Sequence, residues 1–188
     1  MNEKLLWDWL SEPQTALTHV VTRCVREHVR GLHSRGIRFY GFALLPGEHY
    51  DINNIVAAHN CESDIKVPGK HEDYRYYRYS VDEWEHYEPE GFEAVNQLLR
   101  EANLRFASLH SKQEGDYVMD DFEIAHSNSL LEALLCGLEA AKAEGVFGTS
   151  EPFLVMWISD SGNDIMMKSV RHLNSVGVAR AFKKEFGS

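Results

Sequence analysis

The sequence predicts an α/β chain of the mixed, α+β-like kind, with one central, mostly antiparallel sheet flanked by helices. Two near-continuous apolar runs bounded by turn residues, 37–47 and 152–159, have the composition of buried strands. Between and around them, apolar residues recur at every third or fourth position, which indicates amphipathic helices. Helices and buried strands in this alternation pack as layers over a common core.

The first helix is predicted over residues 15–36, where Gly36 ends it. Its apolar stripe contains Leu17, Val20, Val21, Cys24, His28 and Leu32, and its polar face contains Thr22, Arg23, Arg26 and Arg30. The run 37–47 is then interpreted as a central strand. Residues 50–60 are its hairpin partner and residues 59–73 a loop.

The aromatic residues 74–79 are predicted to form a strand that leads into a helix. At Ser80 the pattern changes, because Ser80 and Glu83 have the spacing of a capping box. Tyr79 and Trp84 stand on either side of that cap, at the positions of a hydrophobic staple. We therefore expect a helix to begin at Ser80.

Four more elements complete the predicted order. Helices are expected over 90–106 and 120–145, and Gly145 ends the second one. The buried strand 152–159 follows, and a last helix occupies residues 163–174.

Charge is distributed unevenly along the chain. The net formal charge of −10 divides into +2 for residues 1–45, −13 for residues 46–144 and +1 for residues 145–188. An acidic surface repels phosphate backbones and anionic membranes, so we expect neither nucleic acid nor membrane as a partner. A basic protein would be attracted to it. The alternative interpretation is that the acidic surface only keeps the protein soluble and has no partner.

Cysteine usage and hydropathy favour a reduced, cytoplasmic protein. Cys24, Cys61 and Cys136 are odd in number and widely spaced, which disfavours a disulfide framework or a structural zinc site. The chain start lacks the apolar run of a signal peptide, and no segment is long and apolar enough to cross a bilayer.

No motif of a nucleotide-binding, hydrolase or metalloprotease site occurs in the sequence. Cys24 and His28 lie one helical turn apart, but His19 and His33 point to other sides of that helix, so no metal site is expected there. Residues 160–164 depart from the spacing of a calcium loop. The acidic group Asp116, Asp120, Asp121 and Glu123 fits a helix start better than an acid/base site. We therefore predict no cofactor, no metal and no catalytic residue.

Candidate binding residues fall on two surfaces. A period of two would place Tyr74, Tyr76 and Arg78 on one strand face and Arg75, Tyr77 and Tyr79 on the other, with one face toward solvent or a partner. Asp160 and Asp164 belong to the loop after the second buried strand, where α/β proteins often bind ligands. Capping of the last helix by Ser161, Asn163 or Asp160 is the alternative interpretation of that loop.

Four short motifs in order, at 39–44, 77–99, 133–148 and 158–174, resemble the bacterial family catalogued as domain of unknown function 4303. The resemblance extends from about residue 15 to 175 of an expected single domain, 1–188. It implies one α/β domain and supplies no activity or catalytic residues. Families of this kind are often associated with toxin loci, as immunity or accessory proteins.

Two functional hypotheses follow. The first is a non-enzymatic protein-binding domain, of the immunity or accessory type, whose acidic middle segment meets a basic partner. The second is an enzyme or small-ligand binder with a site near residues 159–164, to which Tyr76, Arg78 or His126 would also contribute. Monomer and homodimer are both compatible with the sequence.

Overall fold

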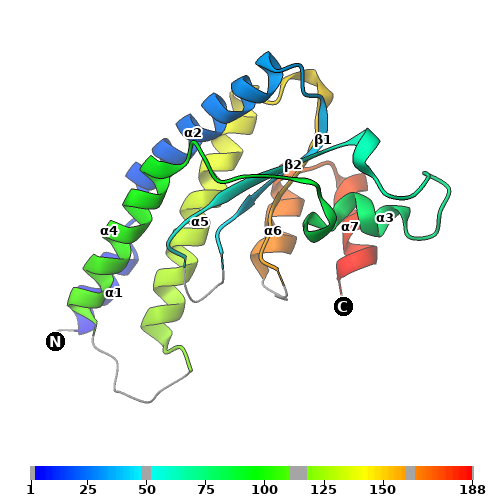
Figure 1. The fold of residues 1–188 in the computed structure, drawn as a ribbon. Coiled ribbons are helices and arrows are strands. Elements are labelled where there is room, and N and C mark those ends of the chain that lie inside the picture. Colours follow the sequence, from blue (N-terminus) through cyan, green and yellow to red (C-terminus); the bar gives the residue numbers. More distant parts are fainter. Residues whose placement is uncertain (1–2, 48–51, 111–117, 160–163, 188) are drawn as a thin grey trace.

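The computed structural model describes residues 3–47, 52–110, 118–159 and 164–187. Four strands form one sheet in the order β3-β2-β1-β4. Figure 1 shows α1, α2, α4 and α5 grouped on one side of this sheet and α3, α6 and α7 on the other. The predicted mixed architecture, with a mostly antiparallel sheet between helices, is confirmed.

The predicted hairpin at the centre of the sheet is confirmed, but within the described residues its second arm begins at Val56 and is shorter than the predicted 50–60. β1 (Phe39–Leu45) pairs antiparallel with β2 (Val56–Cys61), and β4 (Phe153–Met156) runs parallel to β1 on its other side. β3 (His86–Glu88) is short and pairs antiparallel with β2 at the edge of the sheet. Because β2 and the 3₁₀ turn Glu62–Asp64 take up part of residues 59–73, the expectation of a loop there is only partly right.

Three long helices cover one face of the sheet. α2 (Thr15–Ser34) contacts both α4 (Glu93–Leu109) and α5 (Asp121–Ala143), as the predicted helical periods require. Thr22 was expected on the polar face of α2, and that expectation is wrong. Thr22 is buried, and its hydroxyl donates to Gly137 O of α5 at 3.1 Å. A hydroxyl whose hydrogen bonds are satisfied can lie inside a helix pair without a desolvation penalty.

α1 (Glu3–Leu10) and α7 (Val176–Phe186) were not predicted. α1 packs Leu6, Trp9 and Leu10 against α4 and α5 in a small second cluster. α7 places Phe182 in the main core. Within the described residues, no helix is both long and apolar enough to cross a membrane.

The second face of the sheet is built around Trp84. A Cβ placed on Gly41 of β1 would lie 2.6 Å from the Trp84 indole, so glycine lets this ring lie directly on the strand. Phe153, the neighbour of Gly41 on β4, packs edge-on against Trp84 and Tyr79. The two residues of the predicted staple therefore both contact Phe153.

The edge formed by β4 is closed by side chains of the C-terminal part. Asn174 accepts from Leu154 N at 2.9 Å and donates to Leu154 O at 2.7 Å, while the hydroxyl of Ser169 accepts from Met156 N at 3.0 Å. Ser169 lies on α6 (Asp164–Leu173), which matches the predicted last helix. An edge whose backbone groups are already bonded is a poor template for another strand.

Residues 74–79 correct the sequence interpretation. They form α3 (Tyr74–Tyr79), so the predicted strand and its two period-2 faces are wrong. Ser80 is the residue before a 3₁₀ turn (Val81–Glu83) and makes no side-chain cap, so the predicted capping box and the predicted helix start at Ser80 are wrong as well. The preference of aromatic residues for strands reflects packing on a pleated surface, which tertiary contacts override here.

Candidate functional site at the open edge of the sheet

A row of histidines and carboxylates occupies the β3 edge of the sheet, on the face toward α2. The register pairs His59 of β2 with His86 of β3, and their rings stack with centroids 4.8 Å apart. Glu88 lies two residues beyond His86, so the pleat puts it on the same face. Phe42, the partner of His59 on β1, continues the row into the core. Strand pairing thus assembles the cluster from three strands.

Helix α2 and its C-cap residue, Arg35, add two side chains that reach Glu88. Arg35 Nη2 donates to the two carboxylate oxygens at 2.9 and 3.0 Å. His28 Nε2 lies 3.5 Å from Oε2 of the same carboxylate, and His59 Nδ1 lies 4.0 Å from Oε1. One arginine and two histidines therefore converge on Glu88.

Both histidines beside Glu88 are removed from water, with 6% and 2% of their side chains exposed. Burial lowers the pKa of His28, and burial together with the nearby His86 lowers the pKa of His59 to about 4, against the opposing pull of Glu88. Among the described residues, neither His28 Nε2 nor His59 Nδ1 has a hydrogen-bond partner. Neutral, buried imidazoles beside a carboxylate identify this edge as a candidate functional site.

The sequence predicted His28 to lie on the apolar stripe of helix α2. Its ring packs between Phe42 and Phe92, at centroid distances of 6.0 and 5.4 Å. Cys24, one turn away, is buried in the main core, and burial raises the pKa of its thiol. These surroundings fit the predicted core role of the Cys24 and His28 pair.

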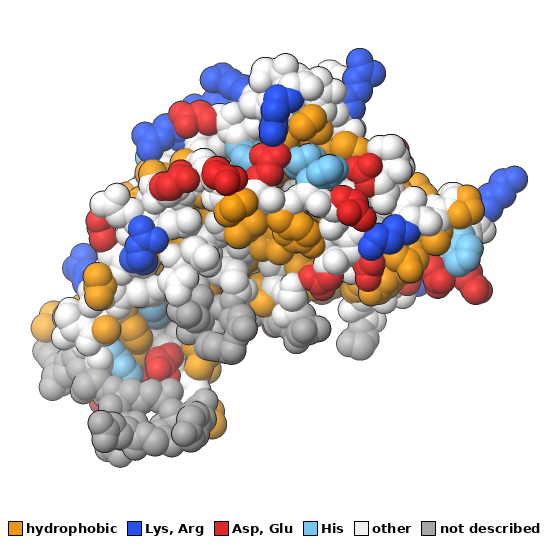
Figure 2. Space-filling model, viewed as in Figure 1, with side chains coloured by type: hydrophobic (Ala, Val, Ile, Leu, Met, Phe, Trp, Pro, Cys, Tyr) orange, Lys and Arg blue, Asp and Glu red, His pale blue; other side chains and the backbone are white. Residues whose placement is uncertain are grey.

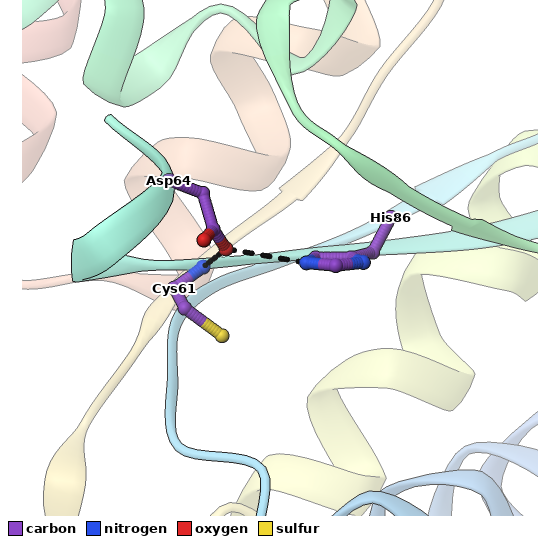
Figure 3. A group of neighbouring side chains, drawn as sticks. All are labelled: Cys61, Asp64 and His86. Carbon is purple, nitrogen blue, oxygen red and sulfur yellow. Dashed lines mark hydrogen bonds and ion pairs between the residues drawn. The ribbon is translucent and has the colours of Figure 1, made fainter. Parts of the chain in front are cut away.

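The outer end of the cluster joins Cys61, Asp64 and His86. Asp64 Oδ2 lies 3.2 Å from His86 Nε2 and accepts from the Cys61 backbone N–H at 3.0 Å. The Cys61 Sγ, a carboxylate oxygen of Asp64 and a ring nitrogen of His86 all lie within 4.8 Å of one another (Figure 3). Thiolate, carboxylate and imidazole are the ligand types of zinc sites, so these three residues could hold a metal ion.

The charges at this end do not favour a nucleophilic cysteine. Burial by itself would raise the pKa of Asp64, but hydrogen bonds from Ser63, the Cys61 N–H and His86 outweigh it and lower that pKa. Burial, followed by the negative charge of Asp64, raises the pKa of the Cys61 thiol. Reactive cysteines need a lowered pKa, which this environment does not provide.

The candidate binding residues Tyr74 and Arg78 lie together, one turn apart on α3. Arg78 Nη1 lies 2.8 Å from both carboxylate oxygens of Glu62 and 2.9 Å from the Tyr74 hydroxyl. Its guanidinium also lies 4.2 Å above the ring of Tyr40. Arg78 is therefore engaged within the protein, and a role in binding stays a prediction.

Tyr76 points away from that pair. Its ring stacks on Phe186 of α7, with centroids 6.1 Å apart, and its hydroxyl lies 3.4 Å from Glu83. Asp164 is the exposed first residue of α6, and Asp160 lies outside the described residues. The structure thus separates the candidate residues that it describes into three places.

The alternative site near residues 159–164 requires groups that belong to different clusters. At its start, Trp157 Nε1 and the Ser159 hydroxyl both donate to Asp82, which ties the end of β4 to the 3₁₀ turn. His126 stacks on Phe106 and Trp9 on the other side of the sheet, among α1, α4 and α5. A common site for Arg78 and His126 is therefore not formed.

The acidic group after residue 116 has a structural role where it is described. Asp120 accepts from Phe122 N and Glu123 N at 3.0 and 2.9 Å, while Glu123 accepts from Asp120 N at 2.9 Å. This reciprocal capping box starts α5, and it confirms the assignment of these acids to a helix start. Asp116 lies outside the described residues.

Two hollows lie elsewhere on the molecule. One of about 240 Å³ is lined by Trp9, Leu98 and Arg105 among other residues, and one of about 230 Å³ lies against Lys142, Phe147 and Asn174. Both are smaller than the roughly 300–1,000 Å³ typical of small-molecule sites. Neither includes a residue of the histidine cluster.

Sequence reasoning did not single out His59, Cys61, His86 and Glu88. Two local signals were present: the segment 59–64 contains a histidine, a cysteine and two acids, and His86 and Glu88 have the spacing of one strand face. Both signals were missed because residues 59–73 were expected to be a loop and a helix was expected to begin at Ser80.

Comparisons with known proteins give a family but no relative of established activity. No curated protein and no solved structure shows significant similarity to the chain. A family model described as Domain of unknown function (DUF4303) matches residues 21–175 of 188. Because this match covers most of the chain, the protein belongs to the DUF4303 family.

Proposed function

We propose that the protein is a non-enzymatic binding domain for a basic protein partner, which docks on the acidic surface around β3. We define this surface by residues 62–93. The observation that carries the proposal is its charge: ten Asp and Glu residues and four Lys and Arg residues, a net charge of −6 over 32 positions. This segment therefore accounts for about half of the −13 of the middle of the chain.

Most of these acids reach the surface. The exposed ones are Glu62, Glu72, Asp73, Asp82, Glu85, Glu90 and Glu93. Figure 2 shows acidic side chains and histidines in a band across the face where residues 81–92 cross the molecule in Figure 1. A surface with this excess of negative charge steers a positively charged partner toward it.

Two of the four bases are already paired within the acidic surface. Lys66 Nζ lies 3.0 Å from Glu83 and 4.0 Å from Glu85, and Arg78 pairs with Glu62. Tyr87 and Tyr76 offer apolar area beside the acids, with 42% and 39% of their surface exposed. Aromatic side chains of this kind are common anchors in protein interfaces.

The test begins with purified full-length protein used to capture proteins from the host at low salt. We expect it to retain a partner rich in Lys and Arg, whose association rate falls steeply as salt rises, because electrostatic steering acts mainly on association. A captured toxin whose activity the protein inhibits would identify it as an immunity protein.

The charge-reversed variant Glu85→Lys, Glu90→Lys and Glu93→Lys should lose that partner. The matched control, Glu12→Lys, Glu101→Lys and Glu151→Lys, changes the net charge equally at exposed acids outside the acidic surface and should keep the partner. Failure to recover any partner, or equal binding by both variants, would refute the proposal.

A further inference from the structure

Three donor atoms of different kinds converge where β2 ends and β3 begins. They are the Cys61 Sγ, a carboxylate oxygen of Asp64 and a ring nitrogen of His86, all within 4.8 Å of one another (Figure 3). Cys61 and Asp64 are half-buried, and His86 is exposed, so the site can be reached from solvent. These three residues belong neither to the hydrophobic core nor to the binding residues predicted from the sequence.

Local structure fixes two of the donors relative to each other. β2 ends at Cys61, and the 3₁₀ turn Glu62–Asp64 folds back over its end. Asp64 accepts from the Cys61 N–H, and the Cys61 side chain in return accepts from the Asp64 N–H. The hydrogen bonds of this turn therefore hold the thiol and the carboxylate close together without a metal ion.

Sheet pairing supplies the third donor. His86 is opposite His59 in the register, and the two rings stack nearly parallel, with planes 9° apart. Its Nε2 already lies 3.2 Å from Asp64 Oδ2. Ligand atoms around a tetrahedral zinc ion lie about 3.5 Å apart. The donor atoms lie at most 4.8 Å apart, so a movement of about 1 Å would bring all three to the spacing of tetrahedral zinc ligands.

A cysteine is an unusual residue at the start of a helical turn. Serine, threonine, aspartate and asparagine are the preferred caps, and a thiol is a weak acceptor. Serine would cap this turn at least as well as Cys61 does. The sulfur is therefore not needed for the cap, and the carboxylate of Asp64 and the imidazole of His86 beside it are further metal-binding groups.

We propose that Cys61, Asp64 and His86 form a binding site for a thiophilic divalent cation of the zinc type, with water at the remaining coordination position. Sulfur and imidazole select zinc or cobalt over magnesium and calcium, which prefer oxygen ligands alone. The proposal is independent of a protein partner, because it rests on side chains that the chain itself brings together.

Cobalt(II) is the probe for the first test, since it replaces zinc and absorbs visible light. The tag-free, chelator-treated full-length protein should bind one Co²⁺ ion, with tetrahedral d–d bands and a near-ultraviolet thiolate-to-cobalt band. Added Zn²⁺ should bleach both. Absence of the thiolate band in the wild-type protein would overturn the proposal.

Variants locate the ion. Cys61→Ser keeps the capping hydrogen bond and should abolish the thiolate band, and His86→Gln and Asp64→Asn should each weaken Co²⁺ binding by at least about tenfold. The controls Cys136→Ser and His172→Gln change a cysteine and a histidine elsewhere and should bind as the wild type does. A thiolate band that survives Cys61→Ser or disappears with Cys136→Ser would place the ion elsewhere.

Thermal unfolding provides a second readout that does not depend on spectroscopy. Zn²⁺ should raise the melting temperature of the wild-type protein, because an ion bound only by the folded state stabilises it. The melting temperature of Cys61→Ser should not respond. If Cys61→Ser does not fold, His86→Gln replaces it, since an exposed side chain on an edge strand can change without loss of the core.

Discussion

Among the residues that the structure describes, His28, His59 and His126 have buried side chains that are neutral at pH 7. Burial lowers the pKa of His28, and it lowers the pKa values of His59 and His126 to about 4. His126 lies among α1, α4 and α5, where its Nε2 is 2.8 Å from Asn103 Oδ1 and its ring stacks on Phe106. Each of them couples folding to pH, because the unfolded chain binds protons that the folded chain excludes.

Replacing His126 by glutamine should reduce the sensitivity of stability to acid. Between about pH 6.5 and pH 4, unfolded His126 is protonated and folded His126 is not, so the free energy of unfolding falls as the pH falls. Below pH 4 both states bind the proton and the loss stops. A pKa difference of this size corresponds to at most about 3 kcal/mol, which solvent screening reduces to roughly 1–2 kcal/mol.

The measurement is urea unfolding of the wild-type protein and His126→Gln at pH 7 and pH 4.5. Glutamine can still hydrogen-bond to Asn103, and Arg105 and the His110–Asp120 pair contact the same aromatic residues in both proteins. His172→Gln, at an exposed histidine, is the control. The prediction would be contradicted if the free energy of unfolding fell by the same amount from pH 7 to pH 4.5 in His126→Gln as in the wild-type protein.

At the scale of single elements, helix starts illustrate where the sequence misleads. Ser80 and Glu83 have the same spacing as Asp120 and Glu123, yet only the second pair forms a capping box. Apolar periodicity continues for many turns after Asp120, whereas the segment after Ser80 turns into β3. The capping pattern therefore identifies a helix only when a long amphipathic segment follows it.

Removing the actual cap should destabilise the protein measurably. Asp120→Ala leaves Phe122 N and Glu123 N without their acceptor and should cost about 1 kcal/mol of unfolding free energy. Asp121→Ala, one residue later and without a capping bond, should cost less. Asp120→Asn keeps an acceptor but loses the ion pair with His110, and should fall between them. Chemical unfolding measures the free energy of unfolding of the three variants. An equal loss of stability in all three would disprove the capping role of Asp120.

The wrong prediction at residues 74–79 has a physical cause. Alternating tyrosines and arginines suit a half-exposed strand, but β2 is already paired with β1 and β3. As a helix, the same residues satisfy three environments: Tyr79 packs on Phe153, Arg78 binds Glu62, and Tyr76 lies on Phe186. Contacts far away in sequence decided between two locally acceptable conformations.

At the scale of the molecule, the close contact of α2 with α5 holds the large helical layer together. Thr18 and Thr22 donate to Ala133 O and Gly137 O across the contact. A Cβ on Gly137 would lie 2.6 Å from Val21 Cβ and 2.9 Å from Thr18 O. The two helices therefore lie closer than any larger residue at 137 allows.

Gly137→Ala should lower the unfolding free energy by about 1–3 kcal/mol, because the added methyl group forces the two helices apart. Gly31→Ala, also within a helix, meets nothing within 4 Å and should stabilise by up to about 1 kcal/mol through helix propensity. Thermal and chemical unfolding of the two variants measure both effects. If both variants changed the free energy of unfolding by the same amount, the close contact of α2 with α5 could not be the cause of the destabilisation.

The sequence by itself determined the mixed α/β class, the buried strands, the long helices and the family. These follow from apolar spacing and from turn residues, which act over a few positions of the chain. Only the tertiary structure decided that His28, His59 and Glu88 meet, that Cys61 lies beside Asp64 and His86, and that residues 74–79 are helical. Those outcomes depend on which strands pair and which faces are buried, and such contacts join segments that local patterns treat separately.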